Sequence, residues 1–194
     1  MGTLFGFAPW IVYWVLVGNV PFLTAVLVAF GTAIGTLIVS QISGKPGRTL
    51  QFGAAVTFAV LTVLTLVASQ QFMERWMQPL GNAGIFLAAL ASVLSRRPFI
   101  REYAEEGQPP EVVNSDLFGK ITTRLTWIWV AVFGGMTVSS AIPPIVQGDA
   151  TILDTKTPLS FVFYWVVPFA LLAVGALVSK ILPDRMTAGL PAPK

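Results

Sequence analysis

The sequence predicts an all-α protein, a polytopic transmembrane helical bundle of about six spans with both termini cytoplasmic. Composition is the first observation, since 55% of the 194 residues are hydrophobic and only 11% are charged, against about 25% charged residues in an ordinary soluble domain. The second is the mean hydropathy of +0.75. The third is the uneven distribution of Lys and Arg. Together they exclude a soluble globular protein, a disordered chain and a secreted disulfide scaffold.

Charge-free stretches of chain set the predicted spans, because crossing a bilayer core of roughly 30 Å takes about 20 helical residues. Residues 1–44 carry no charged side chain, which is too long for one crossing and fits two, joined by a turn at residues 18–21. The predicted spans are residues 4–18, 21–42, 50–69, 80–94, 121–146 and 159–182. Since little chain remains for a soluble domain, residues 1–182 are predicted to form a single transmembrane domain.

Hydrophilic segments connect and follow these spans. Residues 70–79 are expected to form a short connector, residues 96–120 a cytoplasmic amphipathic loop, and residues 183–194 a mobile C-terminal tail. With six spans, ten of the twelve Lys and Arg residues fall on one side of the membrane, and only Arg75 and Lys156 fall on the other. The positive-inside rule makes the basic side the cytoplasm.

The chain contains no Cys and no His. Their absence excludes a thiolate nucleophile, haem held by histidine, Cys-ligated iron–sulfur clusters and typical zinc sites. We therefore predict no catalytic residue, no metal ligand, no cofactor and no enzyme activity. Nucleic-acid binding is not expected, since the basic residues flank apolar segments where they meet anionic lipid. No ionisable residue lies in the middle of a predicted span, which counts against a proton-coupled pump.

The 96–120 loop has the residue pattern of a short helix. Pro98 suits a first helical turn, Gly107 suits a C-terminal cap, and the prolines at 109–110 stop the helix. Such a loop is either a solvated connector that anchors the neighbouring spans or a docking surface or gate.

Side chains within this loop have helical spacing. Phe99 and Tyr103 are four residues apart and share one face. Arg101 and Glu105 have the same spacing and are expected to pair. The candidate contacts to a partner or to lipid are Arg97, Phe99, Arg101, Tyr103 and Glu105.

Small and weakly polar residues mark two further features inside the spans. Gly31 and Gly35 form a GxxxG motif, which lets helices approach closely and is predicted to serve helix packing within the bundle or docking on another subunit. The candidate solute path consists of Thr32, Thr36, Thr57 and Asn82. Such threonines more often bond to their own backbone.

Prolines and aromatic residues form a second pattern in the spans. Prolines at 143–144 and 168 are candidate helix breaks of the kind that mark transporter sites, although proline is also routine in membrane helices. Residues 7–14 and 161–168 share an aromatic and proline character. They lie in the first and last predicted spans, whereas a three-plus-three inverted repeat would match the first span to the fourth, so the sequence gives that repeat little support.

Two segments resemble known bacterial membrane proteins. The loop run with Pro98-Phe99, Tyr103-Ala104, Glu106 and Pro110-Glu111 resembles a motif of uncharacterised small bacterial integral membrane proteins. The segment 7–12, Phe-Ala-Pro-Trp-Ile-Val, is similar to the start of the intracellular septation protein A group. That group is linked to the cell envelope and the division machinery and acts through protein partners. For this chain the resemblance implies a bacterial inner-membrane protein and little more.

The sequence leaves three functions open. The favoured one is a non-enzymatic accessory, assembly or scaffold subunit that packs against membrane lipids and against other membrane proteins or copies of itself. The alternative is a small-solute channel or transporter, which would require a hydrated cavity lined by the candidate path. The lesser alternative is an intramembrane lipid-modifying enzyme that relies on Glu102, Glu105 and Glu106.

Overall fold

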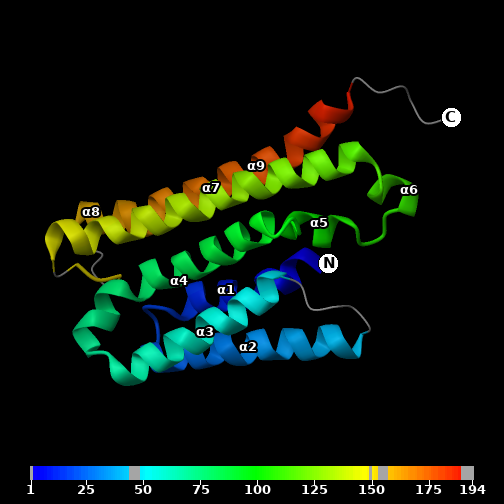
Figure 1. The fold of residues 1–194 in the computed structure, drawn as a ribbon. Coiled ribbons are helices and arrows are strands. Elements are labelled where there is room, and N and C mark those ends of the chain that lie inside the picture. The colour runs from blue at the N-terminus through cyan, green and yellow to red at the C-terminus, as the bar shows by residue number, and fades with distance from the viewer. Residues whose placement is uncertain (1, 44–48, 149, 153–156, 189–194) are drawn as a thin grey trace.

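The computed structural model describes residues 2–43, 49–148, 150–152 and 157–188, and all regular elements in these ranges are helices (Figure 1). The all-α prediction is confirmed. The elements are α1 (Gly2–Leu16), α2 (Phe22–Ile42), α3 (Thr49–Val67), α4 (Gln70–Leu94), α5 (Phe99–Ala104), α6 (Pro110–Val113), α7 (Asp116–Gln147), α8 (Pro158–Phe161), η1 (Val162–Val166) and α9 (Val167–Thr187).

Five helices in the described part of the chain are long and apolar enough to cross a bilayer. Four of these are α2, α3, α4 and α7, and the fifth is the continuous helix Pro158–Thr187 formed by α8, η1 and α9. The apolar part of α1, Gly6–Leu16, is shorter. Exposed large hydrophobic side chains cover the outer faces of these helices, Val56, Leu66 and Ile145 among them, which is the surface that a hydrocarbon solvent requires.

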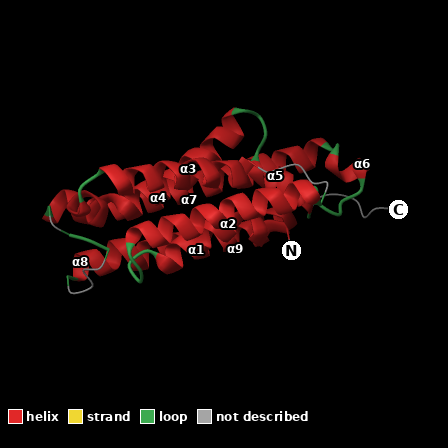
Figure 2. Ribbon diagram, turned by 90° about the horizontal axis from the view of Figure 1, so that it is seen from below, coloured by secondary structure: helices red, strands yellow, loops and turns green. Residues whose placement is uncertain are grey.

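The long helices form two layers (Figure 2). One layer holds α3, α4 and α7, and the other holds α2, α1 and α9. Neighbours along the chain pack against each other from α1 to α4, α7 packs on both α4 and α9, and α1 also packs on α3. The start of α1 and the end of α9 lie at the same end of the bundle, together with α5 and α6 (Figure 1). The short helix α8 lies at the opposite end.

Two helices, α4 and α7, begin five or more residues earlier than predicted. Residues 70–79 belong to α4, so the predicted connector was wrong. The Ser69 hydroxyl accepts from the Phe72 N–H at 3.3 Å and caps the helix, and Met73 and Met77, one turn apart, are buried. Helix α7 begins at Asp116 rather than at 121, because the Ser115 hydroxyl caps the Phe118 N–H at 3.2 Å.

The C-terminal segment is helical for longer than predicted. Helix α9 continues to Thr187 through Pro183, so the first part of the predicted tail is helix. Residues 189–194, the rest of that tail, lie outside the described residues.

The prolines do not end either of the last two long helices, although a π-helical turn precedes one of them. Helix α7 continues through Pro143 and Pro144 to Gln147. In the final helix, residues Val162–Val166 form a π-helical turn just before Pro168. Because Pro168 has no N–H to donate, the backbone of this turn needs another donor, and the Ser139 hydroxyl of α7 donates to the Phe163 carbonyl at 2.6 Å.

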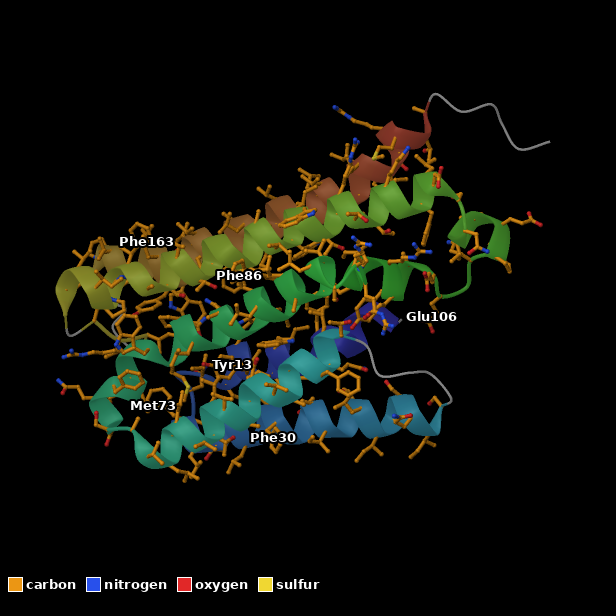
Figure 3. All side chains as sticks on the ribbon, viewed as in Figure 1. Tyr13, Phe30, Met73, Phe86, Glu106 and Phe163 are labelled. Carbon is orange, nitrogen blue, oxygen red and sulfur yellow. The ribbon has the colours of Figure 1, made fainter. Side chains whose placement is uncertain are left out.

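The core of the bundle lies where α1 meets α3 and α4. The Tyr13 ring is 5.2 Å from the Phe58 ring of α3, centroid to centroid, and its hydroxyl donates to the Met77 carbonyl of α4 at 2.6 Å (Figure 3). Gly81 makes this approach possible, since a Cβ there would lie 2.4 Å from the Tyr13 ring. A second close contact joins α4 to α7, where Phe86 lies against Gly134 (Figure 3).

Candidate ligand-binding cleft

An apolar cleft of about 630 Å³ lies between α1 and the η1–α9 helix. Its volume falls within the range of roughly 300–1,000 Å³ usual for small-molecule sites. It is lined by Phe7, Ile11, Trp14, Val15 and Asn19 from α1 and the turn after it; by Tyr164, Trp165, Pro168, Phe169 and Leu172 from η1 and α9; and by Gln78, Trp129, Phe133, Met136 and Ile152.

Helix α1 separates the cleft from the core. Phe7, Ile11 and Trp14 follow one another at spacings of four and three, so they share one helical face and line the cleft. The other face carries Trp10 and Tyr13, which are fully buried. One side of α1 is therefore anchored in the bundle while the other forms a wall of the cleft.

The π-helical turn shapes the opposite wall. Tyr164 and Trp165 lie within it, and Phe169 follows on the same side of the final helix. The Trp165 and Phe169 rings are nearly parallel, with an interplanar angle of 17° and centroids 6.2 Å apart. Because a π-helical turn inserts an extra residue, it shifts the direction in which the next side chains point, and such turns are frequent at functional sites.

The floor of the cleft is an aromatic cluster at its α5 end. Phe7 lies 6.2 Å from both Trp129 and Phe133 of α7, centroid to centroid. Phe99 of α5 lies 6.2 Å from Phe7 and 6.5 Å from Phe133. The cluster thus ties α1, α5 and α7 together at this end of the cleft.

One buried polar atom of the cleft has no hydrogen-bond partner among the described residues. Gln78 is 8% exposed, lines the cleft, and its Oε1 atom makes no hydrogen bond with any described residue. A buried amide without a hydrogen bond costs about 1–3 kcal/mol. By contrast, Trp14 Nε1, which also belongs to the lining, donates to Asn82 Oδ1 at 3.2 Å.

The mouth of the cleft faces sideways. Ile11 and Val15 on one wall are 41% and 63% exposed, and Phe169 on the other wall is 61% exposed. Exposed apolar side chains on long apolar helices suit hydrocarbon rather than water. The described lining contains no Asp, Glu, Lys or Arg, and the described residues contain no cluster of three acidic or metal-ligating side chains.

The residues predicted to contact a partner or lipid lie in and around α5, where several make internal contacts. Phe99 is fully buried and Tyr103 is 7% exposed, because Tyr103 packs where α1 has Gly6, whose added Cβ would meet its hydroxyl. The predicted pair is present, with Arg101 Nε 2.6 Å from Glu105 Oε1. Of the five residues, only Arg97 is exposed; the other four are buried or partly buried.

The acids that the enzymatic alternative needs are engaged in structural contacts. Glu102 accepts from the Thr49 N–H at 2.8 Å and also from the Thr49 hydroxyl, at the start of α3. Glu105 pairs with Arg101. The Glu102 contacts fasten α5 to the start of α3, whereas the Arg101–Glu105 pair lies within α5 and its cap. Gly107 was predicted to cap this helix, but the cap is Glu105, and Gly107 lies two residues beyond it with a φ of +83°.

The predicted packing and solute-path residues are not brought together. A Cβ added to Gly31 or Gly35 would meet nothing within 4 Å, so this face of α2 is not packed inside the chain. Thr32 and Thr36 donate to their own helix, at the Val28 and Ala33 carbonyls. The other two members of the path lie elsewhere: Thr57 packs against Gly84, and Asn82 bonds to Ser140.

The cleft itself was not identified in the sequence. Its two walls come from the segments 7–14 and 161–168 and their continuations, whose shared aromatic and proline character is visible in the sequence. That likeness was the available signal, since aromatic residues at spacings of three and four on two helices make two matching faces. Gln78 gave no signal, because a lone Gln in an apolar helix does not reveal whether its amide is paired.

No protein-family model, curated protein or solved structure matches this chain.

Proposed function

We propose that the protein is a non-enzymatic integral membrane protein that binds the apolar part of a membrane lipophile in the cleft between α1 and α9. The observation that supports it is a lateral, aromatic cleft whose rim consists of exposed apolar side chains. A molecule dissolved in the hydrocarbon reaches such a site without crossing water. Transfer from hydrocarbon to protein adds little hydrophobic free energy, so packing and polar contacts supply the affinity.

Photoaffinity labelling tests this function. The protein in nanodiscs is irradiated with a dodecyl chain that carries a diazirine, and labelled positions are located by mass spectrometry. We expect saturable labelling of Phe133 and Met136 on the floor, competed by unlabelled chain. Val15→Trp at the mouth should abolish this labelling, because the indole fills the entrance. Val28→Trp on the exposed face of α2 is the matched control and should leave it unchanged. Labelling confined to lipid-facing positions, without saturation, would overturn the proposal.

A second candidate, an accessory or scaffold subunit, has one specific observation in its favour. The Gly31–Gly35 face of α2 is open within the chain, and small residues permit close helix approach in membranes. In this role the protein would reside in the bacterial inner membrane, with both termini in the cytoplasm. Capture of the tagged protein from native membranes should retain a stoichiometric membrane partner that Gly31→Leu releases; retention of nothing by the unaltered protein would refute this role.

Solute transport has less support. None of the cavities at the α1–α2 turn, between α1 and α9, or beside Arg101 is lined by Thr32, Thr36, Thr57 or Asn82.

A further inference from the structure

We infer that the cleft selects a neutral lipophile whose planar head carries a carbonyl or hydroxyl group, the chemistry of isoprenoid quinones and quinols. This inference rests on the proposed function and specifies its ligand. Three properties of the described lining lead to it: a free amide, a concentration of aromatic rings, and a lack of charge.

The free amide calls for a hydrogen-bonding group on the ligand. Gln78 is more than nine-tenths buried, lines the cleft and makes no hydrogen bond with a described residue. A primary amide donates through Nε2 and accepts through Oε1. It therefore pairs with a carbonyl through its N–H and with a hydroxyl through its oxygen, and an all-hydrocarbon ligand would leave its desolvation uncompensated.

The aromatic rings call for a flat head. Seven of the residues lining the cleft are aromatic, and both walls contribute indoles, Trp14 from α1 and Trp165 from η1. Rings of this kind pack best against another planar group, in offset or edge-to-face contact. A saturated chain fills the same space with less specific contacts. We therefore expect the planar head of the ligand to lie beside Gln78 and the two indoles.

The lack of charge excludes an ionic head. No acidic or basic residue is among the described lining residues, and an unpaired charge moved into such surroundings carries a large desolvation penalty. A phosphate or carboxylate head is therefore disfavoured inside the cleft. Haem, iron–sulfur and zinc chemistry needs ligands that this chain lacks, but a neutral ring held by packing and one amide needs neither His nor Cys.

Binding measurements with four ligands test the inference. Purified protein in detergent is titrated with decyl-benzoquinone, decylbenzene, decanol and decanoate. Dissociation constants are obtained from thermal stabilisation and from the quenching of tryptophan fluorescence, after subtraction of the ligand signal measured in protein-free micelles. We expect the quinone to bind about tenfold more tightly than decylbenzene, the yield of one neutral hydrogen bond. Decanol should lie between them, because it has the hydroxyl without the ring, and decanoate should bind least.

The Gln78→Met variant separates the polar contact from the apolar one. It should lower quinone affinity to that of decylbenzene and leave decylbenzene binding unchanged. The matched control is Gln51→Met, since Gln51 is also buried but lies outside the cleft and is paired with Ser40. The quinone affinity of this variant should equal that of the unaltered protein.

Each contrary result has a distinct meaning. Equal quinone affinity in the unaltered protein and in Gln78→Met overturns the role of the amide. Decanol binding as tightly as the quinone overturns the planar head. If decylbenzene binds saturably, either of these two results overturns the inference but leaves the proposed function standing. If none of the four ligands binds saturably, the proposed function and the inference are both overturned.

Discussion

The two sides of α1 are built in different ways. On the side facing α4, a hydrogen bond of 2.6 Å joins the Tyr13 hydroxyl to the Met77 carbonyl, and Gly81 leaves room for the ring. On the side facing α9, Ile11, Val15 and Phe169 are exposed across a cleft of about 630 Å³. We call the first side the α1–α4 seam and the second the α1–α9 cleft.

This difference shows how a bundle keeps one gap open. The seam closes because a large side chain meets a glycine, so the helices approach closely. The cleft has large side chains on both walls, Trp14 and Trp165 among them, and bulky groups that face each other hold two helices apart. The same contrast holds for buried glutamines, since Gln51 is paired with Ser40 and Gln78 is not paired with any described residue.

The largest expected effect comes from breaking the seam. Gly81→Leu places a side chain where the Tyr13 ring lies and should destabilise the fold by about 3 kcal/mol, at the upper end of the cost of overpacking. Gly31→Leu is the control, because its Cβ would meet nothing within 4 Å and should cost no stability. Reversible unfolding in detergent measures both. Equal losses in the two variants would show that the seam is not the close contact described here.

The two glutamines should respond in opposite directions. Gln78→Met removes an unpaired buried amide and should stabilise the ligand-free protein by about 1–2 kcal/mol. Gln51→Met breaks a buried hydrogen bond, leaves the Ser40 hydroxyl without this partner, and should destabilise it by a similar amount. The melting temperatures of the variants decide the sign. A loss of stability in Gln78→Met would mean that the amide is paired.

A smaller effect isolates the hydrogen bond of the seam. Tyr13→Phe keeps the ring and deletes the hydroxyl that donates to the Met77 carbonyl, and should cost about 1 kcal/mol. Thr32→Val deletes a hydroxyl that donates only to the Val28 carbonyl of its own helix and should be nearly neutral. Denaturant titration measures the free energy of unfolding of both variants. If Tyr13→Phe left it unchanged, packing alone would hold the seam together.

The smallest effect lies away from both sides of α1 and provides a baseline. Arg96 has a φ of +59° at the end of α4, and the Arg97 N–H donates to the Ser92 carbonyl at 2.9 Å, which together make a Schellman cap. Arg96→Gly should stabilise the protein by about 0.5–1 kcal/mol, since glycine adopts positive φ without strain. Arg97→Gly should bring no such gain. Matched unfolding curves are the measurement.

Helix class and approximate helix positions could be predicted from the sequence because charge and hydropathy act along the chain. The start of α4 was missed because Glu74 and Arg75 made residues 70–79 look like a connector, whereas Met73 and Met77 are buried on the inner face of that helix. A charged pair near the end of a long helix is compatible with membrane packing when it reaches the interface.

The cleft could not be predicted in the same way. Helices apolar on every side carry no amphipathic pattern that says which face meets which neighbour. Whether Trp14 faces a cavity or a ring depends on the separation of α1 and α9, which the π-helical turn at Val162–Val166 helps to set. The GxxxG motif illustrates the same limit, because Gly31 and Gly35 face open space while Gly81, outside any motif, makes the close contact.

A crystal structure of the protein grown in a lipidic mesophase with decyl-benzoquinone tests the central claim most directly. We predict elongated density between α1 and α9, with its ring within hydrogen-bonding distance of the Gln78 amide and its chain against Met136. Direct packing of Trp14 on Trp165, with the cleft closed and no density between the two helices, would contradict the claim.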